Sequence, residues 1–266
     1  MDADPIRPFV SENRCIGRNM KQERDPVIRL KNVGLYYHRR QSWLRWERFW
    51  AIKDVSFNLY QGETLGVIGS NGTGKSTVLR ILAGIMEPDV GQMISNGSQV
   101  MLLSVGLGFV PYMSGRKNAI MSGLLLGADL PTINSKIDDI IAFSELEDFI
   151  DEPVFSYSTG MRARLGFSVA LMMDPDIILI DEVLGVGDQR FREKSTLEIQ
   201  KKIRSNKTVV LVAHNPTIIQ HLCDRTVWIE NGKSRMEGPT EVVLSNYHEY
   251  IKSLQKKVKQ NFSSRK

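Results

Sequence analysis

Eight consecutive residues, 69–76, have the types and spacing needed to hold phosphate groups. They are Gly69, Ser70, Asn71, Gly72, Thr73, Gly74, Lys75 and Ser76, and they match the pattern G-x-x-x-x-G-K-[ST]. Glycines let backbone N–H groups turn toward phosphate oxygens, and a helix N-terminus adds positive potential. We expect Lys75 to reach the β- and γ-phosphates of a nucleotide and the Ser76 hydroxyl to bind Mg²⁺. Thr77 is the next expected nucleotide contact.

The segments on either side of this phosphate-binding loop are those that its chemistry requires. Residues 64–68 are apolar and predict a buried strand, whereas 77–83 have helical spacing. A glycine-rich turn without a ligand is the alternative. The pattern arises by chance in roughly one chain in a hundred of this length, and the strand–loop–helix context favours a nucleotide site further.

Two other apolar runs predict strands that are buried on both faces. Residues 177–182 and 208–214 are continuous and rich in β-branched residues, which is typical of a parallel sheet. Residues 191–204 between them predict a crossover helix, so this part of the chain has α/β construction. Both runs end in polar side chains, at the edge where open α/β sheets bind ligands.

These strand ends supply candidate catalytic residues. We expect Asp181 to hold Mg²⁺ together with Ser76, because a carboxylate at a buried strand end is costly unless it is paired or bound to metal. Glu182 is placed to orient or deprotonate the attacking water. His214 is interpreted as a contact to the γ-phosphate, and a simple polar strand terminus is the alternative.

Composition and charge limit the possible functions. The chain has 266 residues, 42% of them hydrophobic, and a formal net charge of +5. Six of the positive charges lie in residues 252–266, which contain no acid, so the remainder does not form a basic surface for nucleic acid. The basic end is either a solvated helix terminus or an element attracted to an anionic membrane. Two distant cysteines offer no disulfide framework or metal-binding spacing, and a reducing compartment fits them.

Neither a signal peptide nor a membrane-spanning helix is expected. The longest apolar stretch, 100–110, is too short to span a bilayer, and the first residues lack a basic and apolar leader pattern.

A tryptophan-rich segment follows the first predicted strand. Trp43, Trp46 and Trp50 have helical spacing and alternate with arginines, so residues 43–50 predict a short helix with an aromatic stripe and a basic face. Docking of this stripe on its own domain and contact with a membrane interface are both open. Stacking on nucleic acid is disfavoured because no basic domain surrounds the segment.

Residues 157–164 carry the remaining signal, since Ser158 is a good N-cap for the helix that follows. With these motifs in this order, residues 28–245 resemble the nucleotide-binding subunits of ABC transporters. The motif Leu-Ser-Gly-Gly-Gln of that family corresponds to Tyr157, Ser158, Thr159, Gly160 and Met161.

The resemblance implies further roles and partners. It implies that Tyr37 stacks on adenine, that Asp188 belongs to the D-loop, and that two copies pair head to tail around ATP and Mg²⁺. Ser158, Thr159, Gly160 and Met161 of one copy would then reach the ATP held by the other. It also implies a RecA-like P-loop NTPase core of α/β class, with a mixed sheet, an antiparallel β subdomain and a helical signature subdomain.

The expected organisation along the chain has three parts. They are a loose arm at 1–26, a nucleotide-binding domain at 27–245, and a C-terminal helix with a basic tail at 246–266. The domain includes the tryptophan-rich insertion at 38–50 and a helical subdomain at about 113–172.

A closer resemblance is to exporters of O-antigen, capsule and teichoic acid, carried by 50–57, 113–118, 157–164 and 181–189. It implies a peripheral ATPase on the cytoplasmic face of the bacterial inner membrane that powers export of a lipid-linked polysaccharide through a separate permease. The glycan would pass near Trp43, Trp46 and Trp50. The short chain favours a capsule-type or short O-antigen member.

The sequence departs from the family pattern at one motif, and several alternative functions remain open. Residues 103–109 lack the glutamine that the family carries in its Q-loop, so coupling to the permease is in doubt. The rivals are an ATPase for a drug, lipid or small-solute exporter, a soluble P-loop kinase or nucleic-acid motor, and a regulatory subunit that does not hydrolyse ATP.

Overall fold

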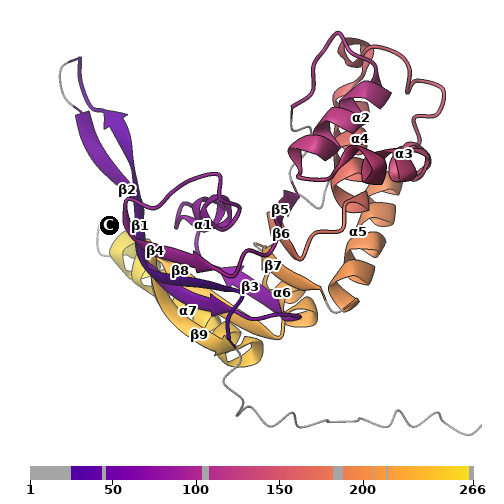
Figure 1. Ribbon diagram of the computed structural model, residues 1–266. Coiled ribbons are helices and arrows are strands. Elements are labelled where there is room, and N and C mark those ends of the chain that lie inside the picture. The colour runs from indigo at the N-terminus through magenta and orange to yellow at the C-terminus, as the bar shows by residue number, and fades with distance from the viewer. Residues whose placement is uncertain are drawn as a thin grey trace, which may run out of the picture.

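A single mixed sheet organises the chain in the computed structural model, which describes residues 25–43, 46–103, 108–181, 188–205, 207–213 and 215–263. The spatial order of the strands is β4-β1-β2-β9-β8-β3-β7-β6-β5 (Figure 1). The strands are β1 (Ile28–Arg40), β2 (Trp46–Leu59), β3 (Thr64–Ile68), β4 (Val90–Ser95), β5 (Val100–Leu103), β6 (Ile177–Asp181), β7 (Thr208–Val212), β8 (Arg225–Glu230) and β9 (Lys233–Pro239).

The parallel half of the sheet confirms the buried strands predicted from continuous apolar runs. Strands β8, β3, β7, β6 and β5 pair in parallel, and every residue of β3 and β7 is buried. Burial on both faces explains why these runs do not alternate between apolar and polar residues. Because the strands are parallel, their carboxyl ends share one edge of the sheet.

The other half of the sheet is antiparallel except where β2 meets β9, which pair in parallel at Asp54 and Lys233. Strand β1 pairs with β2 and β4, and β8 pairs with β9 through a turn at Asn231 and Gly232. Both turn residues have positive φ, 52° and 75°, as a two-residue hairpin turn of the mirror-image type requires. This half agrees with the expected antiparallel β subdomain.

Helices cover the sheet and build a separate lobe. They are α1 (Lys75–Leu82), α2 (Gly115–Leu125), α3 (Leu130–Ser144), the short 3₁₀ helix η1 (Val154–Ser156), α4 (Thr159–Met172), α5 (Gln189–Arg204), α6 (Pro216–Leu222) and α7 (Thr240–Ser263). Helices α2, α3 and α4 form the lobe, which stands away from α1 (Figure 1). The lobe has its own core, with Ile133, Ile140 and Leu165 fully buried. The helices of the lobe lie between Gly115 and Met172.

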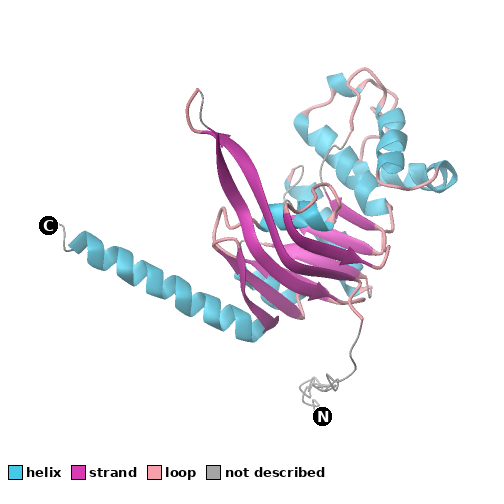
Figure 2. Cartoon of the chain, turned by 60° about the vertical axis from the view of Figure 1, so that its left-hand side comes forward, coloured by secondary structure: helices cyan, strands magenta, loops and turns pink. Residues whose placement is uncertain are grey.

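The tryptophan-rich segment is not the short helix that its spacing predicts. Strands β1 and β2 continue past the sheet as a projecting hairpin, shown in Figure 2, with Tyr37 opposite Phe49 and Arg40 opposite Trp46. The helical spacing was misleading because β1 supplies a partner strand for the backbone groups of 46–50, and aromatic residues suit such a pairing. Trp46 and Trp50 therefore share one face of the ribbon, whereas Trp43 lies at its tip.

Helix α7 begins at Thr240 and runs to Ser263. Its first half packs on Trp228 of β8, whose ring lies 5.4 Å from that of Tyr247 and 5.1 Å from that of Tyr250. The second half extends away from the body of the molecule (Figure 2). No helix within the described ranges combines the length and apolar composition needed to cross a bilayer. Residues 1–24 of the predicted arm lie outside those ranges.

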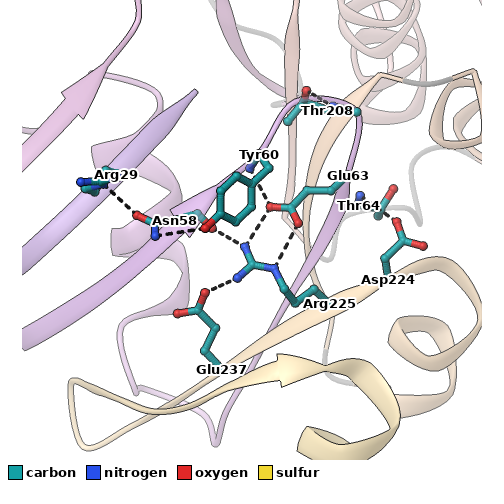
Figure 3. Close-up of polar contacts among 10 residues, drawn as sticks. Arg29, Asn58, Tyr60, Glu63, Thr64, Thr208, Asp224, Arg225 and Glu237 are labelled. Atoms are coloured by element: carbon teal, nitrogen blue, oxygen red, sulfur yellow. Dashed lines mark hydrogen bonds and ion pairs between the residues drawn. The ribbon is translucent and has the colours of Figure 1, made fainter. Parts of the chain in front are cut away.

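A half-buried polar cluster joins the two halves of the sheet at the edge opposite the phosphate-binding loop (Figure 3). Arg225, the first residue of β8, donates to both oxygens of Glu63, at 2.9 and 3.1 Å, and also to Glu237 and the Asn58 carbonyl. Its guanidinium lies 5.0 Å from the centre of the Tyr60 ring. These groups satisfy one another, so the cluster stabilises the fold and offers no free group for a ligand.

Candidate functional site

A pocket of about 330 Å³ lies at the carboxyl edge of the parallel strands. It is lined by Tyr37, Phe49, Ala51, Asn71, Gly72, Gly74, Lys75, Ser76, Thr77, Asp181 and Val212. The pocket thus collects predicted residues from β1, the phosphate-binding loop, α1 and β6. Its size is that of an ordinary small-molecule site.

The phosphate-binding loop turns tightly between β3 and α1. Gly69 has φ 155°, and a Cβ there would lie 2.0 Å from the Ile229 carbonyl oxygen. Gly74 has φ 96°, and its Cβ would lie 2.3 Å from a methyl of Ile52. Only glycine fits either position, because each combines a left-handed backbone with a neighbour in the way of a side chain. The loop is therefore built for close backbone approach.

Helix α1 directs its N-terminus into this pocket without a side-chain cap. Gly74 is the N-cap, and no acidic residue lies in the first turn. The first N–H groups of a helix carry partial positive charge, and anions stabilise them. A phosphate group suits this position because it accepts hydrogen bonds from these N–H groups and carries negative charge.

Lys75 is a buried cation at the floor of the site. Its side chain is 6% exposed, and its ammonium donates to the carbonyl oxygens of Gly69 at 2.8 Å and Ser70 at 2.9 Å. Burial lowers the pKa of the ammonium, while the negative charges of Asp181 and Glu230 oppose that shift. The two carbonyl oxygens are neutral, so a phosphate oxygen would supply the negative charge that the Lys75 ammonium lacks as a partner.

Glu230 is a functional candidate that the sequence did not reveal. It ends β8 and is 9% exposed, and its carboxylate accepts from the Ser70 hydroxyl at 3.2 Å and the Trp228 indole N–H at 3.3 Å. It therefore ties the phosphate-binding loop to β8 and, through Trp228, to α7. A glutamate at the end of a predicted strand is too common a signal to have been singled out.

Asp181 and Ser76 both line the pocket, as the predicted Mg²⁺ site requires. Asp181 pairs with Val212 in register, so the ends of β6 and β7 are adjacent. Among the residues with described positions, no three His, Cys, Asp or Glu side chains cluster to hold a metal by themselves. A carboxylate and a hydroxyl, completed by phosphate oxygens and water, fit the oxygen ligands and incomplete protein shell that Mg²⁺ prefers.

The far end of the pocket is aromatic. Tyr37 is 36% exposed, and its hydroxyl donates to the Met86 sulfur at 3.5 Å, which fixes the ring beside the pocket. Phe49 on the facing strand lines the same space. The predicted base-binding position of Tyr37 is therefore compatible with the pocket. Phe49 is a further pocket residue, which was not predicted because 43–50 was interpreted as a helix.

The signature residues lie on the helical lobe and not in this pocket. Ser158 caps α4 by accepting from the Met161 N–H at 3.1 Å. Ser158 and Thr159 are exposed, and a Cβ on Gly160 would meet only the Ser158 hydroxyl, at 3.7 Å. The capped helix N-terminus is thus open to the outside of the chain, away from α1 (Figure 1).

Asp188 caps α5 and also approaches the signature helix. Its carboxylate accepts from the Phe191 N–H at 2.9 Å and lies 3.9 Å from Arg164 of α4. These two groups keep the pKa of Asp188 below its usual value, with the backbone hydrogen bond as the larger cause. Arg164 also lies 3.7 Å from Glu145, which pairs with Lys194 at 3.1 Å. This network, which the sequence did not predict, connects α3, α4 and α5.

Three parts of the predicted site lie outside the described residues. They are Glu182, His214 and the stretch 104–107 that includes Ser104 of the altered Q-loop. Asp181, which immediately precedes Glu182, lines the pocket, and so does Val212, which lies two residues before His214.

Known proteins place the chain in one family. Residues 52–185 match the ABC transporter family model. The O-antigen export system ATP-binding protein RfbB of Klebsiella pneumoniae is 39% identical over 240 residues, covering 84% of this chain and 98% of the relative. The RfbB protein of Myxococcus xanthus is 42% identical, and the teichoic acids export ATP-binding protein TagH of Enterococcus faecalis is 44% identical. These alignments cover 79% and 76% of this chain, but the chain spans only 49% and 45% of those two relatives.

Solved structures agree on the fold. The dimeric ATP-binding cassette MJ0796 bound to ADP and Pi superimposes with a TM-score of 0.65 at 22% identity, covering 80% of this chain and 98% of that one. The α/β P-loop NTPase fold expected from the motifs is therefore confirmed. The sequence relatives and the family match both lead to the same conclusion: this chain belongs to the ABC transporter family.

Proposed function

We propose that this chain is an ATPase that powers export of a lipid-linked cell-surface polysaccharide. The observation that carries the proposal is the single pocket in which Lys75, Ser76 and Asp181 meet the aromatic residue Tyr37. In this set, Lys75 suits the phosphates, Ser76 and Asp181 suit Mg²⁺, and Tyr37 suits the base. The relatives are named for O-antigen and teichoic acid export.

Each residue has a definite task in ATP hydrolysis. Lys75 and the loop amides bind the β- and γ-phosphates, and Ser76 with Asp181 would hold Mg²⁺, which supplies positive charge to the phosphate oxygens. Glu182 follows Asp181 and orients the attacking water or accepts its proton. His214 contacts the γ-phosphate from the end of β7. Tyr37 stacks on the adenine base.

The site is completed by a second copy of the chain. Ser158 and Thr159 are exposed at the N-terminus of α4, with the half-buried Gly160 and Met161 beside them, and none of the four lines the pocket of its own chain. A helix N-terminus offered to solvent suits a phosphate on another molecule. Two copies arranged head to tail bring each signature and D-loop Asp188 to the other copy's ATP.

The chain acts as a peripheral subunit at the cytoplasmic face of the bacterial inner membrane, beside an integral permease. Trp43 and Trp46 at the hairpin tip are 81% and 63% exposed and are available to a membrane surface or a lipid-linked glycan. Trp50 packs against Tyr36 and is less available. No nucleic-acid partner is proposed.

Two substitutions test the ATPase directly. Lys75→Ala removes the buried cation and is expected to abolish ATP binding and hydrolysis. Glu182→Gln is expected to retain ATP binding, to lose turnover by about 100-fold or more, and to accumulate an ATP-bound dimer in size-exclusion chromatography. Unchanged turnover in Glu182→Gln would contradict the assigned role of this glutamate.

The cargo is tested separately. The chain and its permease, purified together from cells labelled in their surface glycan, are expected to retain an undecaprenyl-linked polysaccharide, and Lys75→Ala cells are expected to accumulate it inside. Accumulation of a soluble drug or of a simple lipid instead would contradict the polysaccharide assignment while leaving the ATPase assignment intact.

A further inference from the structure

Phe49 and Tyr37 form a cross-strand pair at the base-binding end of the pocket. The two residues are directly opposite one another in the β1–β2 pairing, and both line the pocket. Ala51, two residues from Phe49 on the same strand, lines it as well. Because residues directly opposite one another in an antiparallel pair share a face, Tyr37 and Phe49 lie on the same face of the hairpin, and Ala51 lines the pocket from the irregularity in the β2 register.

The opposite face of the hairpin is occupied in a different way. There, Tyr36 contacts Trp50 at 5.2 Å and His38 at 5.4 Å between ring centres, and the Arg48 guanidinium lies 4.7 Å from the Tyr36 ring centre. These aromatic groups are satisfied within the hairpin. Phe49, by contrast, is 51% exposed and faces the pocket space.

Charged and aromatic groups occupy different parts of the pocket lining. Lys75, Ser76 and the N-terminus of α1 attract phosphate, and Ala51 lies against Gly74 beside them. The Tyr37 and Phe49 rings supply the aromatic part of the lining. A nucleotide has the same polarity, with charged phosphates at one end and a flat apolar base at the other. Aromatic side chains bind bases by stacking and edge contact.

We propose that Phe49 is a second base-binding residue, which contacts the nucleobase together with Tyr37 and favours purine over pyrimidine nucleotides. This inference rests on the proposed function. A purine presents two fused rings, enough surface for a stacking ring and a second ring at its edge, whereas a pyrimidine presents one.

Nucleotide binding to Phe49→Ala tests the proposal. ATP affinity is expected to fall about 5- to 20-fold, since contact between an aromatic side chain and a base contributes on that order. The preference for ATP over UTP is expected to shrink by a similar factor. Phe49→Tyr, which keeps a ring, is expected to retain both affinity and preference.

A probe without a base separates base contact from a structural effect on the loop. Inorganic tripolyphosphate with Mg²⁺ occupies only the phosphate end, so its affinity is expected to be the same in wild type and Phe49→Ala. The matched control is Phe149→Ala, which removes a 49% exposed phenylalanine outside the pocket lining and should leave both ligands unaffected.

The outcomes distinguish this inference from the proposed function. Equal ATP affinity in wild type and Phe49→Ala, or an equal loss for ATP and tripolyphosphate, overturns the role of Phe49. Absence of ATP binding by wild type overturns the proposed function itself. A fall in the thermal midpoint of Phe49→Ala with unchanged nucleotide preference shows that the pair only stabilises the hairpin, and it also overturns the inference.

Discussion

Gly69 and Gly160 differ in whether the fold leaves space for a side chain. Gly69 cannot carry a side chain, because its Cβ would lie 2.0 Å from the Ile229 carbonyl oxygen. Gly160 lies in the first turn of α4, and its Cβ would have space. The first glycine is required by the fold of one chain, whereas nothing within one chain requires the second. A requirement for Gly160 would therefore report contact with another molecule.

Gly160→Ala is expected to separate stability from turnover. The free energy of unfolding should be unchanged or up to about 1 kcal/mol higher, because alanine is the better helix former. ATP binding to the monomer should also be unchanged. ATPase activity should fall about tenfold or more, because the added methyl displaces the amide from the phosphate of the other copy.

The control for this prediction is Gly69→Ala, which should lower the thermal midpoint sharply because the loop must move. Full ATPase activity in Gly160→Ala would contradict a role for the Gly160 amide at the dimer interface.

Cys223 illustrates how burial removes reactivity. Burial, assisted by the charge of Asp224, raises the pKa of its thiol to about 12. In a Cys15→Ser variant, which leaves Cys223 as the single thiol, we expect almost no reaction with a disulfide reagent at pH 8 and one equivalent after denaturation.

The same shift predicts the sign of a pH effect on stability. The folded thiol keeps its proton above pH 9 while the unfolded thiol loses it, so Cys223 favours unfolding progressively as the pH rises from about 9 to about 12. A rapid reaction of the native thiol at pH 8 would contradict its burial.

At the scale of elements, the network around Arg164 connects the signature helix to its neighbours. Arg164 of α4 lies between Glu145, which follows α3, and Asp188, which caps α5, and its side chain is 17% exposed. Lys194 of α5 pairs with Glu145 and lies 4.5 Å from the Phe143 ring centre. A change in the position of Asp188 would therefore alter the charge environment of Arg164 on α4.

Arg164→Ala is expected to lower the free energy of unfolding by about 1 kcal/mol, because it removes a half-buried cation from two carboxylates. Arg162→Ala, on the same helix but at an exposed position, should change it by less than about 0.5 kcal/mol. Chemical denaturation measures both. In a double-mutant cycle, Arg164→Ala and Glu145→Gln should be non-additive, and additive effects would show that the pair makes no net contribution.

At the scale of the whole molecule, the phosphate-binding loop and the signature are on separate parts of the chain. Figure 1 shows α1 beside the sheet and α4 in the helical lobe. Under the proposed head-to-tail pairing, one chain therefore contributes half of each of two composite sites. This arrangement makes activity depend on association, so specific ATPase activity should rise with protein concentration.

A mixing experiment tests the head-to-tail arrangement. Lys75→Ala disables the phosphate-binding loop, and Ser158→Arg blocks the signature, so each variant alone should be inactive. In a mixed dimer, one site carries both defects and the other carries neither. An equal mixture should therefore recover about one quarter of wild-type activity, if exchange is random and the sites act independently.

The matched control mixes Lys75→Ala with wild type. An inactive mixture of the two variants, formed under conditions where subunits are shown to exchange, would mean that both motifs must be intact in both chains. Full activity of either variant alone would mean that the composite site is wrong.

Local patterns were enough to identify much of this protein from its sequence. The loop at 69–76, the strand that ends at Asp181 and the Ser158 cap were each predicted, because their chemistry depends on neighbours in the chain. Backbone conformation, helix capping and strand burial leave such short-range signals in the residue types. The order of the motifs then sufficed for the family.

Tertiary structure alone decided which side chains from distant segments share a space. The aromatic residues of 43–50 fit a helix by spacing, and only pairing with β1 makes them a strand and places Phe49 opposite Tyr37. Glu230 reaches Ser70, 160 residues away in sequence, because β8 lies beside β3. Pairing between distant strands depends on the whole sheet, so no local pattern specifies it. The separation of Ser158 from Lys75, which leaves the site incomplete in one chain, is likewise a property of the folded molecule.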